Sequence, residues 1–518
     1  MTTIPRSRRL VAGSLGLATT TALVLAGCST GAPSPSTGGD GAASTAPLIV
    51  GVTTDVDTLL PWTATQFQAI NVLQNVYGTL TELDAELNVV PGLAESWEVS
   101  EDGLSVVFAL RDGVVFSDGS TFDAEDVVAS YEAIQDPETA AVSATNLASV
   151  TAIEATDERT VTMTLSAPDA ALPSKLAPVT TAILPSDADL AALEAAPVGT
   201  GAFVFDERRA NEAVLLTANE DYWGGAPAIG GVEFRVIPDQ AAIVSALQSG
   251  NVQMAVFDDA LVADTIGGTV EIAETPQLSY HALQLNARDE ALADVNVRLA
   301  IACAIDRQEV LDTAALGEGE VTGPITSPAF RSDPDARPCP QADPEAAADY
   351  LEAAGVGEGL TLRAIVMQGG YSTAVAEAEN IQAQLAEVGI TLELDVLESG
   401  AYVDRWVAGD FQLAVALNGG QPDPDAAYGR YFTSTGNLNA VAGYSSDTLD
   451  ALFEQGRASS DQAEREAIYA DVSAELEEQA AWVWLFTSFN YTATAEGVSG
   501  FVPMPNGSLQ HLRDVTID

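Results

Sequence analysis

The chain has 518 residues, of which 75 are Asp or Glu and only 20 are Lys or Arg, so its formal net charge at pH 7 is −55. This balance argues against a nucleic-acid-binding protein, because neutralising phosphate requires basic surface. Two histidines and three cysteines exclude most zinc, haem and iron–sulfur sites through a shortage of ligands. We interpret the acidity as a solvated surface, with steering of cationic ligands as the alternative.

The first segment has the features of an export signal. Three arginines at residues 6–9 precede an apolar stretch over residues 10–26, and Cys28 follows after one glycine. The end of this stretch, Leu-Ala-Gly-Cys, resembles the bacterial lipobox, in which the Cys is lipidated and becomes the new N-terminus. A membrane-spanning anchor is the alternative, but the apolar core is short and threonines interrupt it. We therefore expect a signal peptide at residues 1–27, and an exported protein anchored by lipid to the outer face of the cytoplasmic membrane.

Residues 28–46 are rich in Ser, Thr, Gly and Pro, so we expect a flexible tether there. Export also places Cys303 and Cys339 in an oxidising compartment. We predict that these two cysteines form a disulfide bond, which in the chain-entropy model stabilises the fold by roughly 4 kcal/mol. Two buried free thiols are the alternative.

From residue 47 onward, short β-rich runs alternate with amphipathic helical patterns, and no second run of eighteen apolar residues occurs. Strands are predicted over residues 48–52 and 106–110. A helix is predicted after Asp123, with Asp126 in its acidic first turn. The 47% apolar share is ample for large cores, and strands interleaved with helices predict an α/β fold of more than one domain.

The C-terminal half continues the same alternation. The pattern predicts a buried strand over residues 411–416 and a long helix capped by Ser460. A helix over residues 374–388 followed by a strand over 390–396, and an apolar strand over 481–486, complete the predicted elements.

Several motifs then occur in a specific order. Residues 93–104 read LAESWEVSEDGL, 110–114 read LRDGV, 116–119 read FSDG and 124–128 read AEDVV. These motifs resemble the extracellular solute-binding protein family 5, the peptide and nickel group of ABC importers. Further motifs that resemble the family follow at residues 199–203, 219–225, 234–239, 246–251, 296–298, 304–307, 343–347 and 354–355.

The resemblance implies a bilobal periplasmic-binding-protein fold of type II, with an extra inserted domain and a ligand cleft between the lobes. Carried onto this chain, it assigns residues 47–75, 196–277 and 487–518 to lobe I, 76–195 to the inserted domain and 278–486 to lobe II. The lobes are expected to close around the ligand by a hinge motion.

The function that the resemblance implies is that of a substrate-binding lipoprotein of an ABC importer. Such a protein is not an enzyme and needs no cofactor or metal. Its expected partners are a peptide or other small solute, the permease with its ATPase subunits, and the membrane through the lipid anchor. The protein itself is expected to be a monomer.

One loop is the first candidate for the cleft. Residues 417–425 read LNGGQPDPD, and their glycines would let a ligand approach the backbone while the aspartates accept hydrogen bonds. The alternative for each aspartate is a capping carboxylate in a turn. Aromatic residues are further candidates for ligand contact, although large rings also pack well in hydrophobic cores. The full set of ligand-contact candidates is Asn418, Gly420, Gln421, Asp423, Asp425, Gln368, Tyr371, Tyr280 and Trp62.

Two departures from the family pattern bear on the ligand. Peptide-binding relatives place an Asp for the peptide amino group where this chain has Gly420. Dipeptide binders place an Arg for the carboxylate where this chain reads Gly369, Gly370 and Tyr371. Without this pair of charges, ligand length is not fixed, so a longer peptide held by main-chain hydrogen bonds is favoured over a dipeptide. An opine-like or sugar-like solute is the alternative, and nickel is disfavoured because the two histidines lack a ligand-like spacing.

A secreted hydrolase is the competing class. The sequence contains no Gly-x-Ser-x-Gly, His-Glu-x-x-His or Cys-x-x-Cys motif. Paired carboxylates could still be drawn from the 75 acids. A solute-sensing receptor would share the fold and differ only in its partner.

Overall fold

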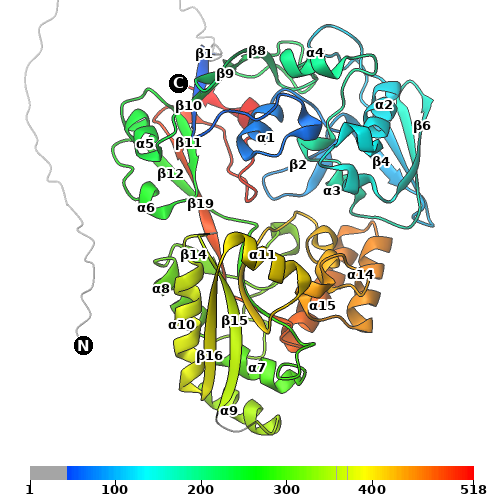
Figure 1. Ribbon diagram of the computed structural model, residues 1–518. Helices are drawn as coiled ribbons and strands as arrows, with labels where there is room; N and C mark the ends of the chain where they lie inside the picture. The colour runs from blue at the N-terminus through cyan, green and yellow to red at the C-terminus, as the bar shows by residue number, and fades with distance from the viewer. Residues whose placement is uncertain (1–43, 357–358, 370) are drawn as a thin grey trace, which may run out of the picture. The chain divides into compact units, whose positions relative to one another are not determined.

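The computed structural model is drawn as a ribbon in Figure 1. The expected signal peptide at residues 1–27 and the expected lipid anchor on Cys28 lie outside the described residues. The strand β1 (Ser44–Val52) begins within the last three residues of the segment that we expected to be a tether. Within the described part of the chain, none of the helices is long and apolar enough to cross a bilayer. The structure describes residues 44–356, 359–369 and 371–518.

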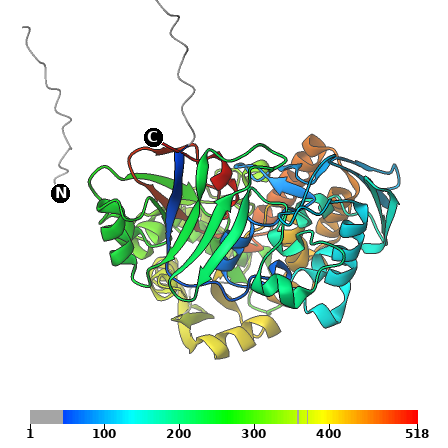
Figure 2. The ribbon, with the colours of Figure 1, turned by 90° about the horizontal axis from the view of Figure 1, so that it is seen from above.

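The largest sheet has eight strands and is built mainly from the segments expected to form lobe I. The strand β1 is parallel to both of its neighbours, and its residues Leu48 and Val50 are buried. Figure 2 shows strands of this sheet side by side, with β1 in dark blue. In spatial order the strands are β12 (Glu271–Pro276), β19 (Phe486–Thr494), β11 (Met254–Phe257), β1, β10 (Ile229–Val236), β9 (Ala213–Ala218) and β8 (Phe203–Arg209), with β14 (Gly319–Val321) paired to β19.

Two helices pack against this sheet in one apolar cluster. The helix α5 (Gln240–Gln248) begins after Asp239, whose carboxylate accepts a hydrogen bond from the amide of Ala242, and it contributes buried Ile243 and Leu247. The short helix α6 (Ala260–Ala263) follows β11 directly.

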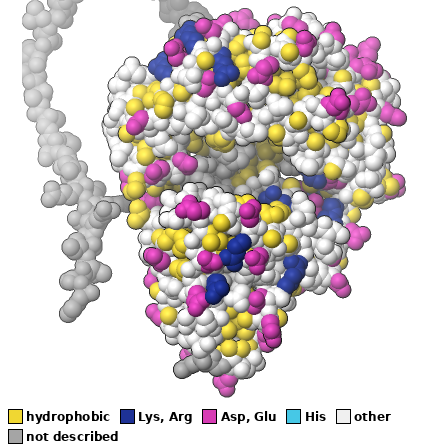
Figure 3. All heavy atoms as spheres, in the orientation of Figure 1, with side chains coloured by type: hydrophobic (Ala, Val, Ile, Leu, Met, Phe, Trp, Pro, Cys, Tyr) yellow, Lys and Arg dark blue, Asp and Glu magenta, His cyan; other side chains and the backbone are white. Residues whose placement is uncertain are grey.

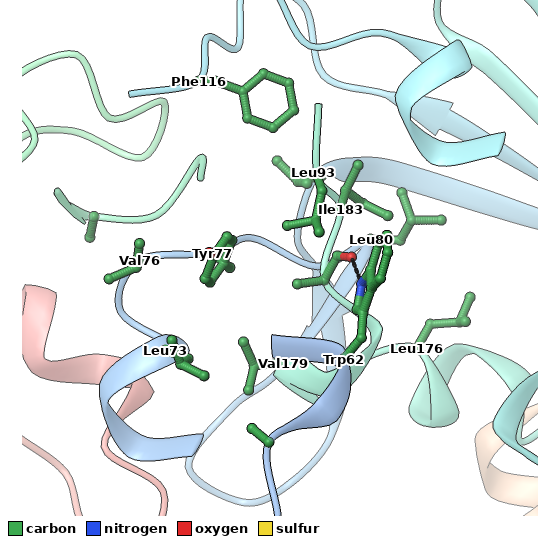
Figure 4. Close-up of a cluster of buried hydrophobic side chains, with 14 of the residues drawn as sticks. Trp62, Leu73, Val76, Tyr77, Leu80, Leu93, Phe116, Leu176, Val179 and Ile183 are labelled. Atoms are coloured by element: carbon green, nitrogen blue, oxygen red, sulfur yellow. Dashed lines mark hydrogen bonds between the residues drawn. The ribbon is translucent and has the colours of Figure 1, made fainter. Parts of the chain in front are cut away.

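The segment 76–195 carries a four-stranded sheet of its own. Its helix α2 (Ala124–Gln135) has the predicted start, because Asp123 and Asp126 form a reciprocal capping box. The core of this segment is continuous with that of the large sheet, and Figure 4 shows Tyr77, Leu93 and their neighbours in it. The elements are β2 (Thr81–Leu83), β3 (Val89–Pro91), β4 (Ala94–Val99), β5 (Ser105–Leu110), β6 (Val150–Asp157), β7 (Thr160–Leu165), α3 (Leu172–Lys175) and α4 (Leu190–Ala195).

A five-stranded sheet organises residues 280–484. Its strand β13 (Tyr280–Leu285), which lies between two other strands of the sheet, is buried along its whole length. Cys303 and Cys339 are joined by a disulfide bond, with their Cα atoms 5.1 Å apart. The other strands are β16 (Ile390–Glu398), β15 (Leu360–Gln368), β17 (Leu413–Asn418) and β18 (Trp482–Trp484). The helices are α7 (Val295–Ala304), α8 (Arg307–Ala314), α9 (Pro344–Ala353), α10 (Ala374–Glu387), α11 (Ser399–Ala408), α12 (Arg430–Phe432), α13 (Asn439–Ala442), α14 (Asp447–Ala458) and α15 (Gln462–Glu478).

Two chain crossings between these sheets run side by side. The first is the segment 277–279 between β12 and β13, and the second is Leu485 between β18 and β19. The hydroxyl of Thr487 donates to the carbonyl oxygens of Gln277 and Ser279, each at 2.7 Å. Because hydrogen bonds tie the two crossings together, a change in the angle between the sheets must bend both of them at once.

Two predictions about the C-terminal half are wrong in detail. The apolar run 481–486 is not one strand, because Leu485 divides it between β18 of one sheet and β19 of the other. The run is apolar on both faces since both parts are buried, so its pattern carries no sign of the break. The helix α15 is capped by Asp461, whose carboxylate accepts from the amide of Glu464, and not by Ser460.

Candidate ligand-binding site

Two adjoining cavities open beside the first crossing. The central cavity has a volume of about 460 Å³, and the side cavity has about 280 Å³. Both are lined by the start of the helix α1 (Phe67–Leu73), by the crossing and by the loop after β17. Figure 3 shows the corresponding hollow in the surface. The residues that line both cavities are Phe67, Asn71, Leu278, Gly420 and Asn506.

The central cavity lies at the carboxyl ends of β1 and β11. Residues 50–53 and 256–258 line it, together with the amide side chains of Gln68, Gln240 and Gln277. Parallel neighbouring strands end at the same edge of a sheet, where α/β proteins commonly bind ligands. Amide side chains can donate and accept hydrogen bonds, so this wall suits a ligand with main-chain-like polar groups.

An aromatic ring separates the two cavities. The side chain of Phe67 is 45% exposed, although it is large and apolar. Gly507 lies beside the ring, because a Cβ added at Gly507 would be 2.9 Å from the ring atom Cζ of Phe67. The buried Asn71 ties α1 to the same C-terminal loop, since its Oδ1 accepts from the amide of Leu509 at 3.1 Å. Phe67 therefore offers an exposed apolar surface that a ligand can cover.

The side cavity is mainly apolar and has one compensated ion pair in its wall. The guanidinium of Arg513 contacts the carboxylate of Glu82 at 2.7 Å and donates to the hydroxyl of Tyr222 at 3.1 Å. Burial lowers the pKa of Arg513, but the Glu82 carboxylate outweighs this effect and keeps that pKa above its usual range. Since the two charges satisfy each other, the cavity offers room chiefly for an apolar group.

The loop after β17 contacts the first crossing through its glycine. A Cβ at Gly420 would lie 2.1 Å from the carbonyl oxygen of Leu278, so no side chain fits at this position. The neighbouring Gly419 has open space around it, and Gln421 lines the side cavity. Of the candidates predicted in this loop, Gly420 and Gln421 therefore line a cavity.

The two aspartates of the same loop lie elsewhere. Asp423 is 3% exposed, and its carboxylate accepts from Arg465 at 2.7 Å. Asp425 contacts Arg457 at 2.8 Å. Burial raises the pKa of the Asp425 carboxyl above its usual range, and the Arg457 guanidinium opposes this only in part. Both carboxylates form ion pairs with arginines of the helices α14 and α15, and neither lines a cavity.

Other predicted contacts are also absent from the two cavity walls. Asn418 is buried and accepts from Gln284 at 3.0 Å. Gln368 is exposed at the end of β15. The ring of Tyr371 packs against His281 at 5.4 Å, and burial raises the pKa of its hydroxyl.

The two remaining aromatic candidates belong to cores. Trp62 is 3% exposed, and its indole nitrogen donates to the carbonyl oxygen of Ala182 at 2.8 Å (Figure 4). Tyr280 is 1% exposed and stacks on Tyr428 with ring centroids 5.7 Å apart. Large rings gain most from burial, which explains why the sequence alone did not separate them from cleft residues.

Sequence reasoning missed several cavity residues. Phe67, Asp258 and Leu278 carry no motif, and Asn506 comes from the far C-terminal segment. Asp258 could have been found, because it directly follows the apolar run over residues 254–257, which forms β11, and α/β proteins commonly bind ligands at the ends of such strands.

Two α/β lobes joined by paired crossings, with cavities where they meet, define a type II periplasmic binding protein. The family model described as bacterial extracellular solute-binding proteins, family 5 (middle region), matches residues 88–439. The chain therefore belongs to this family and is a solute-binding protein of an ABC importer.

Individual relatives agree with this assignment. The chain is 29% identical over 463 residues to probable di/tripeptide-binding protein 5 of Pseudomonas aeruginosa, covering 83% of this chain and 87% of that protein. Among solved structures, HbpA2 from Haemophilus parasuis is 26% identical with a TM-score of 0.84, covering 91% of this chain and 100% of that one. AgaA from A. tumefaciens R10 in complex with agropinic acid is 28% identical with a TM-score of 0.68, covering 91% and 99%.

Proposed function

We propose that this protein captures an oligopeptide in the two cavities and delivers it chemically intact to the permease of its importer. The observation that carries the proposal is the composition of the central cavity. A peptide main chain needs donors and acceptors spaced along its length, and the amide-lined wall offers both. The side cavity, with Phe67 at its entrance, then accommodates an apolar side chain. The di/tripeptide-binding relative supports the same ligand class.

The proposed contacts follow from these walls. Gly420 and Gln421 are retained from the sequence-based candidates, and Phe67 is added to them. Gly420 leaves the loop after β17 without the acidic group that peptide-binding relatives place there, so we assign the site to longer peptides over dipeptides.

We also propose how the chain is divided into two lobes and an inserted domain. Lobe I comprises residues 47–75, 196–277 and 487–518, the inserted domain 76–195 and lobe II 278–486. The boundaries near residues 277 and 487 are supported by the two crossings, which join one sheet to the other. We also propose that the protein is a monomer anchored through lipid on Cys28, so that its site lies near the membrane-embedded permease.

A non-peptide solute is the second candidate. The relative AgaA, in complex with agropinic acid, favours an opine-like ligand. The glycine at position 420 also favours it, because a ligand without a peptide amino terminus needs no acidic group there.

Calorimetric titration with tri-, tetra- and pentapeptides tests the peptide assignment. We expect binding with release of the unchanged peptide, as checked by mass spectrometry. Phe67→Ala should weaken binding of peptides with a large apolar residue by about tenfold, since it removes a contact surface of aromatic size. Leu261→Ala is the matched control, because Leu261 in α6 is 62% exposed and lines neither cavity. Recovery of cleaved peptide would contradict the proposal, and so would binding of opines without any peptide.

A further inference from the structure

We propose that the ligand of the central cavity carries a cationic hydrogen-bond donor, an ammonium or guanidinium group, and that Asp258 of lobe I binds it together with Gln240. This inference rests on the proposed function and narrows its ligand class. It assigns a charge-selecting role to residues at the ends of β11 and α5.

The first support is the charge of the cavity wall. Of the described residues that line the central cavity, Asp258 is the one with a charged side chain. Its exposed carboxylate has no ion pair or hydrogen bond to another described residue. In the side cavity, by contrast, the carboxylate of Glu82 is compensated, since it contacts Arg513 at 2.7 Å. The charge of Asp258 is therefore available to a ligand.

The second support is the set of amide side chains on the same wall. Gln68, Gln240 and Gln277 line the central cavity together with Asp258. An ammonium or guanidinium group has several N–H donors, and amide oxygens can accept those that one carboxylate does not. A carboxylate and amide groups lining one cavity therefore suit a group with several N–H donors.

Alternative occupants fit these residues less well. An anion would face the Asp258 carboxylate, and of the described residues lining this cavity none is Lys, Arg or His. A metal ion would lack ligands, because the described residues contain no group of three His, Cys, Asp or Glu side chains that could hold one. An ammonium group needs fewer acceptors and can use neutral amide oxygens as well.

The geometry of the loop after β17 explains why the carboxylate that binds the cation comes from lobe I. The family resemblance places an acidic residue for the peptide amino group at position 420, where this chain has glycine. The carbonyl oxygen of Leu278 leaves no room there for a side chain. Asp258 approaches the same cavity from the opposite lobe, so the cation-binding role is carried by a different element of the fold.

The experiment compares three probes: the peptide Ala-Ala-Phe-Ala, its N-acetylated form, and N-acetylated Ala-Lys-Phe-Ala. Each is titrated into the protein and into Asp258→Asn. Asp206→Asn is the matched control, because it removes the same charge from an exposed position in the same sheet, away from both cavities. We expect Asp258→Asn to weaken binding of the cationic probes by about tenfold or more, and Asp206→Asn to have no effect.

The acetylated probes locate the cation. Strong binding of the free peptide alone assigns Asp258 to the amino terminus, and strong binding of the acetylated lysine peptide assigns it to a side chain. Equal affinity of all three probes, or equal affinity of Asp258→Asn and the parent for the free peptide, would overturn the inference.

Failure of the peptide assignment can be told apart from failure of this inference. If no peptide binds, the ligand that copurifies from the host is identified by native mass spectrometry. A non-peptide ligand with a cationic nitrogen, bound more weakly by Asp258→Asn, would support the inference while rejecting peptides. A copurified ligand without such a group would overturn it.

Discussion

Replacing Gly420 with alanine perturbs the contact between the loop after β17 and the first crossing. The added Cβ would lie 2.1 Å from the carbonyl oxygen of Leu278 and 2.6 Å from its carbonyl carbon. These are backbone atoms, so no side-chain rotation relieves the overlap. Gly420 is not among the residues with positive φ, so the effect is one of space and not of backbone conformation.

The magnitude follows from the distance. Ordinary contact begins at 3.4 Å, so the loop and the crossing must separate by about 1 Å for the alanine to fit. Overpacking of this kind costs about 1–3 kcal/mol. Both cavities are lined by Gly420 and Leu278, so the same displacement changes the ligand-binding surface. We expect Gly420→Ala to lower the free energy of unfolding by about 1–3 kcal/mol and to weaken ligand binding.

Gly419 offers a matched control one residue away. A Cβ at this position meets nothing within 4 Å, and its φ is not positive. Gly419→Ala should therefore leave the free energy of unfolding unchanged or raise it by about 0.4–1 kcal/mol, because alanine reduces the freedom of the unfolded chain. The assay is urea-induced unfolding of both variants, followed by calorimetry with the tetrapeptide Ala-Ala-Phe-Ala. If the two variants unfold at the same urea concentration, the loop does not contact the crossing in solution, and the reasoning is refuted.

Two further predictions concern the cysteines. Cys303→Ser with Cys339→Ser removes a crosslink over 36 residues of sequence, and the chain-entropy model gives a loss of about 4 kcal/mol in the free energy of unfolding, measurable by urea denaturation against the parent. Unchanged stability of the double variant would contradict this. Cys28→Ala should move the protein from the membrane fraction to the medium, as followed by immunoblotting, and continued membrane retention would argue against a lipid anchor.

The fold was predictable because local and family-level signals agree. The helix after Asp123 begins with two carboxylates at capping positions, and the structure places both in a capping box. The strand division at Leu485 was not predictable, because each half is buried in its own sheet and the sequence reads as one apolar run. Hydrophobic pattern reports whether a residue is buried, but it does not report in which of two cores it lies.

The site was predictable only in part, for a related reason. Asp423 and Asp425 have the sequence features of ligand acceptors, yet their partners Arg465 and Arg457 lie on helices more than 30 residues away. An acidic side chain in a loop looks the same in sequence whether an arginine compensates it or not. Only the fold distinguishes these two aspartates from Asp258, which lines the central cavity.

The scarcity of basic residues determines how many carboxylates are left without an ion-pair partner. The chain has 20 Lys and Arg against 75 Asp and Glu, so most carboxylates cannot have an ion-pair partner. The guanidinium group of Arg513 in the side cavity wall is engaged by a carboxylate of the protein, and so are those of Arg457 in α14 and Arg465 in α15. The central cavity is thereby left with acceptors and one negative charge, in a molecule whose overall field attracts cations. Selection for a cationic ligand would then follow from the position of one uncompensated carboxylate in the wall of the central cavity, without any dedicated recognition motif.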